Sequence, residues 1–229
     1  MADSRPPARR DRWGELRALT KQGALIAAGP FRRRRTLRGR RVVLFLHGFL
    51  ATGEVLRPLA DTVHRETGLP TGIFRSPMHS IDFTKIVDRF ERFVGDEVPT
   101  EASISLVGHS LGGLVARWYA QERDRERRVD RIVTLATPHA GTGLARFTPE
   151  VLRDALDPLG PTITQLRERR STLSAVPHVN IVAGKDLLVR PRSSALALDD
   201  AATHELEGVG HNEILYFPKT ARLVVDALR

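Results

Sequence analysis

A run of strand-forming residues, a Gly-x-Ser-x-Gly motif and a helical pattern follow one another directly between residues 103 and 118. Gly108 and Gly112 flank Ser110 at the junction of the two patterns. Glycine suits both positions, because a sharp strand-to-helix turn strains the serine backbone and would make neighbouring side chains collide. Such a turn exposes the hydroxyl and places the first helix amides where they can stabilise a developing negative charge. The order of strand, motif and helix therefore favours a nucleophilic serine over an ordinary glycine-rich turn.

Buried strands alternate with amphipathic helices from residue 42 onward. Apolar runs predict strands at 42–46, 71–75, 103–107, 131–136, 179–183 and, more weakly, 203–207. This alternation is typical of a mostly parallel central sheet with helices on both faces, which places its sites at the carboxyl ends of the strands. We therefore expect one α/β domain over residues 42–229. A helical stretch at 143–176, broken by prolines, is the candidate insertion and would form a small lid or a pocket wall.

The basic residues are concentrated at the N-terminus. Residues 1–41 hold 13 of the 36 Lys and Arg residues and three acidic ones, whereas the remaining chain has 23 basic and 24 acidic groups. This asymmetry defines a basic arm over residues 1–41, partly disordered or forming an amphipathic helix, and argues against a nucleic-acid partner. The helix expected at 13–28 would pack on the domain, lie on an anionic membrane surface, or serve as a tail that binds nucleic acid or another partner.

The composition excludes several classes of protein. The chain lacks cysteine, which rules out a disulfide framework, a thiolate zinc site and a cysteine nucleophile. No stretch reaches the roughly 20 apolar residues of a membrane-spanning helix. The short apolar segment at 23–31 is followed by arginines, the wrong flank for a signal-peptide cleavage site. We therefore expect a cytoplasmic protein, with membrane association through the arm as the alternative.

The histidines after Ser110 supply candidates for the base that a serine nucleophile needs. His211 lies in a glycine-containing loop after the last predicted strand, from which it could reach the serine. His139 follows a proline turn and is interpreted as bracing a loop or lining a pocket. His178 comes before a strand, at the end away from the site, and His204 lies within the last predicted strand. His211 is therefore the predicted base.

An acidic residue should orient that histidine, and the chain order Ser, Asp, His is common in proteins with this serine turn. Asp186 follows the strand predicted at 179–183, which brings it to the same edge of the sheet as the serine. Asp199 and Asp200 are fallback candidates in a more polar stretch. We expect Ser110, Asp186 and His211 to form a catalytic triad.

Two backbone amides are predicted to form an oxyanion hole. One belongs to Leu111, the residue directly after the serine. The other belongs to Phe49, in the His47-Gly48-Phe49 loop that follows the first predicted strand. His47 is expected to hydrogen-bond within this loop and to take no part as a base.

These motifs together resemble the α/β-hydrolase superfamily and, within it, the bacterial triacylglycerol lipase and esterase branch with its PGAP1-like relatives. The resemblance spans roughly residues 42–228 and rests on His47-Gly48-Phe49, Gly108-His109-Ser110-Leu111-Gly112-Gly113, Thr137-Pro138-His139-Ala140-Gly141-Thr142, Asp186 and Gly210-His211. It implies ester hydrolysis through an acyl-serine intermediate with no cofactor and no metal. It also implies the triad and the oxyanion donors named above. The chain is short for a secreted lipase, so any lid should be small.

We therefore expect a serine-dependent hydrolase of carboxylic esters that acts on lipid-like or small acyl esters. An acyltransferase or thioesterase would use the same residues. A catalytically idle module that binds a membrane or a partner through the basic arm is the alternative from another class.

Overall fold

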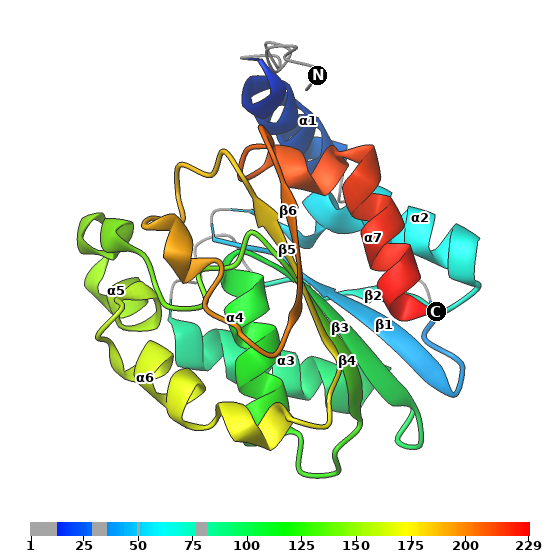
Figure 1. Cartoon of the computed structure of the whole chain (residues 1–229). Helices are drawn as coiled ribbons and strands as arrows, with labels where there is room; N and C mark the ends of the chain where they lie inside the picture. Colours follow the sequence, from blue (N-terminus) through cyan, green and yellow to red (C-terminus); the bar gives the residue numbers. More distant parts are fainter. Residues whose placement is uncertain (1–12, 29–35, 50, 77–81) are drawn as a thin grey trace, which may run out of the picture.

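A six-stranded parallel sheet forms the centre of the computed structural model, which describes residues 13–28, 36–49, 51–76 and 82–229 (Figure 1). The strand order is β2-β1-β3-β4-β5-β6, and every neighbouring pair is parallel. The strands are β1 (Arg41–Leu46), β2 (Thr71–Ile73), β3 (Ser103–His109), β4 (Val129–Leu135), β5 (His178–Ala183) and β6 (Ala202–Leu206). All six predicted strands are present, and the parallel α/β fold expected from the sequence is confirmed.

Helices cover both faces of this sheet (Figure 1). Seven α-helices lie within the described residues: α1 (Gly14–Ala28), α2 (Arg57–Thr67), α3 (Phe83–Glu97), α4 (Leu111–Trp118), α5 (Glu150–Leu156), α6 (Pro161–Glu168) and α7 (Pro218–Leu228). Short helical turns connect them: η2 (Gly53–Leu56), η3 (Tyr119–Arg123), η4 (Gly143–Phe147), η5 (Arg170–Leu173), η6 (Arg192–Ser194) and η7 (Glu213–Tyr216). None of the helices in the described ranges is long and apolar enough to cross a membrane.

The core consists of two apolar layers, one on each side of the sheet. Alternate residues of β1 divide between them, because successive side chains of a strand point to opposite faces. Leu44 packs with α3, α4, α5 and α6, whereas Val43 and Phe45 pack with α2 and α7. The two layers bury most of β1 to β5, whereas the first residues of the edge strand β6 are exposed.

The insertion predicted at 143–176 is built from η4, α5, α6 and η5 and packs on one layer of the core. Leu152 of α5 and Leu166 of α6 have no exposed surface and belong to the same cluster as α3 and α4. The buried Arg117 of α4 donates a hydrogen bond to the Leu166 carbonyl at 3.0 Å, near the C-terminal end of α6, where cations are favoured. This segment therefore adds a further helical layer over α3 and α4 on one side of the sheet.

Candidate active site

Ser110 occupies a sharp turn between β3 and α4, as the motif predicts. Its backbone angles are φ 55° and ψ −124°, a combination that side-chain-bearing residues rarely adopt. The surroundings require glycine, since a Cβ on Gly108 would lie 2.5 Å from the Cα of Gly113, and one on Gly112 would collide with the Leu46 carbonyl. The Ser110 amide donates to the Leu135 carbonyl of β4 at 2.9 Å, which fixes the turn to the neighbouring strand.

Asp186 and His211 meet at the same edge of the sheet, from the loops after β5 and β6. The His211 Nδ1–H donates to Asp186 Oδ2 at 2.7 Å, and each side chain is only 6% exposed. Burial alone would raise the pKa of Asp186, but the hydrogen bond from His211 and the amides of Val189 and Leu188 outweigh burial and lower it. Asp186 is therefore ionised at neutral pH and fixes the His211 tautomer with the proton on Nδ1, so Nε2 is free to accept a proton.

His109, the residue directly before Ser110, links the serine turn to the His211 loop. Its Nε2–H donates to the His211 carbonyl at 2.9 Å, and the two rings lie 4.9 Å apart. Burial, with the neighbouring His211 as a second cause, lowers the pKa of His109 to about 3. His109 is therefore an uncharged, fixed donor. The Gly-x-Ser-x-Gly motif allows any residue at position 109, so the sequence did not predict that His109 would bind the His211 loop.

The His47-Gly48-Phe49 loop lies against the serine. A Cβ on Gly48 would stand 3.0 Å from the Ser110 Cβ and 3.3 Å from the His109 carbonyl oxygen. His47 hydrogen-bonds within the loop, as expected, because its Nδ1 donates to the Gly48 carbonyl at 2.8 Å while Nε2 accepts from the Ser76 amide. Burial lowers the pKa of His47, which keeps it neutral. The Leu111 amide opens α4 and is one of the amides that a helix leaves without an acceptor of its own.

The Thr137–Thr142 stretch braces the loop that carries Asp186. The Thr142 hydroxyl donates to the Leu188 carbonyl at 2.8 Å and accepts from the Arg190 amide at 3.1 Å. His139 is buried and hydrogen-bonds Thr134 and Asn180 of the adjacent strands at 3.1 Å and 3.3 Å. The interpretation of His139 as a bracing residue is thus confirmed.

The remaining candidates of the sequence lie away from the serine turn. His178 is buried against Thr134, and His204 is exposed on β6. The fallback acid Asp200 pairs with Arg170 at 2.5 Å, and Asp199 is exposed. The structure therefore brings Asp186 to His211 and leaves both fallback acids outside that pair.

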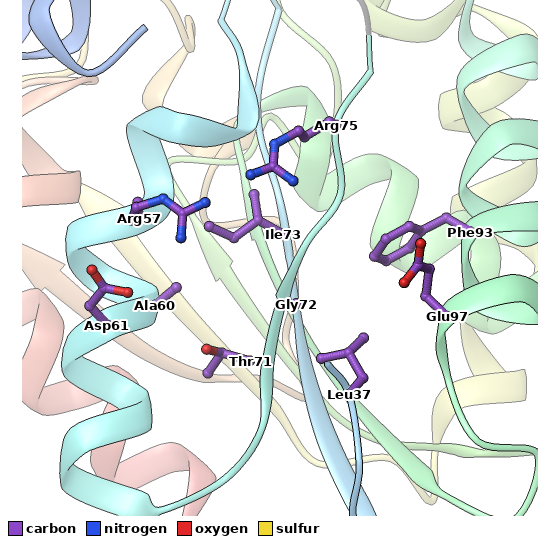
Figure 2. A pocket seen from close by; sticks show the side chains of 10 residues that line it. All are labelled: Leu37, Arg57, Ala60, Asp61, Thr71, Gly72, Ile73, Arg75, Phe93 and Glu97. Atoms are coloured by element: carbon purple, nitrogen blue, oxygen red, sulfur yellow. The ribbon is translucent and has the colours of Figure 1, made fainter. Parts of the chain in front are cut away.

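A small cavity of about 30 Å³ lies beside β2 (Figure 2). The side chains of Arg57 and Arg75 border it, and both bind the Glu54 carboxylate, at 2.7 Å and 2.6 Å. None of the site residues described above lines it. Its size is about that of one water molecule, so it is a packing space beside an ion-pair cluster and no substrate site.

A buried parallel sheet with a strained serine after its central strand β3, and a His–Asp pair at the same edge, defines a hydrolase of the α/β-hydrolase superfamily. Within that superfamily, residues 37–192 match the family described as the PGAP1-like alpha/beta domain, and the chain belongs to this family. The matched range contains Ser110 and Asp186 and ends before His211. Both α1 and the His211 loop therefore lie outside it.

Known proteins resemble the chain in part or in fold. The GPI inositol-deacylase of Candida albicans is 44% identical over 61 residues, which are 26% of this chain and only 16% of that protein. The lin2722 gene product of Listeria innocua has the same fold, with a TM-score of 0.61 and 16% identity over 83% of this chain and 94% of its own. A structure described under LipS and LipT, two metagenome-derived lipolytic enzymes, has a TM-score of 0.57 and 17% identity over 83% of this chain and 92% of its own.

Proposed function

We propose that the protein is a serine hydrolase that cleaves carboxylic esters through an acyl-serine intermediate. One observation carries the proposal: the strained turn at Ser110 lies beside the buried Asp186–His211 pair, to which His109 connects it directly. This arrangement joins a nucleophile, a base and an orienting carboxylate. In the same proposal, the amides of Phe49 and Leu111 form the oxyanion hole.

The proposed reaction has two halves. His211 Nε2 takes the Ser110 proton as the hydroxyl oxygen attacks the ester carbonyl carbon, and the resulting oxyanion accepts hydrogen bonds from the Phe49 and Leu111 amides. Asp186 stabilises the imidazolium. The imidazolium then gives its proton to the departing alcohol, which leaves the acyl group on Ser110. In the second half His211 takes a proton from water, the hydroxide attacks the acyl carbon, and Ser110 recovers its proton as the acid leaves.

A fluorophosphonate probe tests this proposal directly. The wild-type protein should be labelled stoichiometrically at Ser110, and a folded Ser110→Ala variant should show neither labelling nor ester turnover above about one ten-thousandth of the wild-type rate. Full esterase activity in that variant would sink the proposal. A folded wild-type chain that is never labelled would instead support the idle module.

The acyl acceptor and the substrate need a separate assay. The same triad would serve an acyltransferase or a thioesterase, in which an alcohol replaces water or a thiol leaves. A matched panel of p-nitrophenyl esters of increasing chain length, acyl-CoA, phospholipid and acylated inositol lipid separates these cases. The inositol lipid is included because one relative is named as an inositol deacylase. Faster release from thioesters than from all oxygen esters would replace the esterase proposal.

A second proposal concerns α1, which we infer makes peripheral contact with an anionic membrane. The observation in its favour is an apolar outer face: Trp13, Leu16 and Leu19 are 61%, 53% and 48% exposed. In the sequence, basic residues flank this helix and supply the charge that attracts an anionic surface. Exposed aromatic and aliphatic side chains next to basic ones are typical of helices that lie in a membrane interface. Vesicle flotation tests this contact.

A further inference from the structure

The inner face of α1 binds the chain segment that directly follows His211. The Glu15 carboxylate accepts hydrogen bonds from the Asn212 amide at 3.0 Å, the Asn212 side-chain nitrogen at 2.6 Å and the Glu213 amide at 3.1 Å. Both carboxylate oxygens are used, because the Glu213 amide bonds Oε2 while the Asn212 side chain bonds Oε1. A carboxylate that receives several amide hydrogen bonds is a strong anchor for a backbone segment.

The contact between α1 and this segment is closely fitted on both sides. Gln22 lies about two helical turns after Glu15 on the same face of α1 and is 8% exposed. Its side-chain nitrogen donates to the Asn212 side-chain oxygen at 3.0 Å. A Cβ on Gly210 would collide with the Glu15 carboxylate, and a Cβ on Gly14 would collide with the Glu213 carboxylate. Glu213 in turn accepts from the Gly210 amide at 3.1 Å. The two glycines therefore leave room for the carboxylate that each segment receives from the other.

No strand holds His211, since β6 ends at Leu206 and η7 begins only at Glu213. Its loop is held instead by contacts from several directions, among them a hydrogen bond of 2.9 Å from the Lys185 amide to the Val209 carbonyl. From the serine side, His109 donates to the His211 carbonyl at 2.9 Å. From the opposite end of the sequence, Glu15 and Gln22 hold Asn212, the next residue. These contacts fix the backbone on both sides of the His211 side chain, and the Asp186 carboxylate binds the imidazole itself at Nδ1.

We propose that α1 is a positioning element of the active site, in which Glu15 sets the backbone of His211 and Asn212 and so aims the imidazole at Ser110. The inference rests on the proposed function of Ser110 and His211. Neither Glu15 nor Gln22 touches the reacting atoms in this role. A small displacement of a general base lowers the rate of proton transfer far more than it weakens substrate binding. The signature is therefore a decrease in kcat at a nearly constant KM.

The test compares full-length Glu15→Gln with the wild type and with Glu101→Gln, an exposed carboxylate in the turn before β3. Glutamine keeps the size of the side chain but turns one acceptor oxygen into a donor that faces backbone amides. We expect the fluorophosphonate labelling rate and kcat of Glu15→Gln to fall about tenfold or more, with KM within about twofold of wild type. The low-field proton NMR signal of His211 Nδ1–H should shift or broaden. Glu101→Gln should match the wild type in every readout.

Two further results make the test decisive. A wild type that labels readily and a folded Glu15→Gln variant that labels at the same rate would overturn the inference and leave the proposed function standing. A wild type that never labels would instead refute the proposed function. If Glu15→Gln does not fold, Gln22→Met removes the second attachment more gently and should lower the labelling rate about threefold per folded molecule. A loss that only follows the unfolded fraction would assign α1 a purely structural role.

Discussion

Ser110 is held in its turn by residues whose own side chains take no part in bond making. Gly108, Gly112 and Gly48 give it room, and His109 ties its turn to the His211 carbonyl. At the scale of single residues the geometry is therefore set by missing Cβ atoms and one neutral histidine. These are small features with large effects, because an oxyanion donor displaced by a few tenths of an ångström stabilises the transition state less.

Gly48→Ala tests the tightness of the oxyanion loop. The new methyl group would lie 3.0 Å from the Ser110 Cβ, so the loop or the serine must move. We expect kcat/KM for a short ester to fall by roughly tenfold or more, with the fold retained. Gly95→Ala is the matched control, because a Cβ there meets nothing within 4 Å. That change in the exposed part of α3 should leave kcat/KM alone and raise stability by about 0.5–1 kcal/mol. Wild-type activity in Gly48→Ala would mean that Phe49 is not a donor.

At the scale of elements, α1 has two faces with separate tasks. Its inner face packs on η2 and η7 and binds the His211 loop, whereas its outer face exposes apolar side chains beside basic ones. The sequence left packing on the domain and contact with a membrane as competing interpretations. In the structure they are compatible, because packing uses Glu15, Ala18 and Gln22 and leaves Trp13, Leu16 and Leu19 outside.

Flotation with lipid vesicles tests the outer face. The wild type should rise with vesicles that contain phosphatidylserine, and less so at high salt, because exposed charges are screened. Replacing Trp13, Leu16 and Leu19 by serine should reduce the bound fraction about fivefold or more while turnover of a short soluble ester persists. Leu159→Ser is the control, since Leu159 is 88% exposed but lies between α5 and α6. Equal flotation of wild type and triple variant, or none by either, would remove the proposed membrane contact.

At the scale of the whole molecule, buried neutral histidines couple the stability of the fold to pH. Burial lowers the pKa of His47, His109, His139 and His178, to about 3 for His109. For His139 and His178 the nearby Arg117 and Arg170 guanidinium groups act in the same direction. Each of these histidines also accepts a hydrogen bond from a guanidinium group at 3.2 Å, which requires a neutral ring.

The stability should therefore decrease as the pH falls below about 6.5, the ordinary histidine value. In that range the unfolded chain binds protons that the folded chain does not, so the free energy of unfolding rises with pH. Each neutral histidine contributes up to about 1.4 kcal/mol per pH unit until its folded pKa is reached, near pH 3 for His109. Urea unfolding at several pH values between neutral and about pH 5 measures the slope.

Single substitutions assign this slope to particular residues. In the His139→Asn variant the unfolded chain should take up about one proton fewer, so the free energy of unfolding should depend less steeply on pH. A wild-type stability that is flat over this range would show that the buried histidines take up protons without cost.

The sequence by itself determined the local structure and the residues at the sheet edge. Alternating buried strands and amphipathic helices fixed the fold, because hydrophobic periodicity and backbone hydrogen bonding act over a few residues. The glycines around Ser110 predicted its turn, and the chain order pointed to Asp186 and His211. The exact strand ends differed little, although β2 closes at Ile73, two residues before the predicted end.

Only the tertiary structure decided which distant polar groups meet. Glu15 and Asn212 are 197 positions apart, and His109 and His211 are 102 apart, with no periodic pattern to connect them. From the sequence alone, Glu15 in the first turn of α1 would be assigned only a favourable interaction with the N-terminal end of the helix dipole. Which amides it binds depends on where the sheet carries the His211 loop, and that is a property of the whole fold.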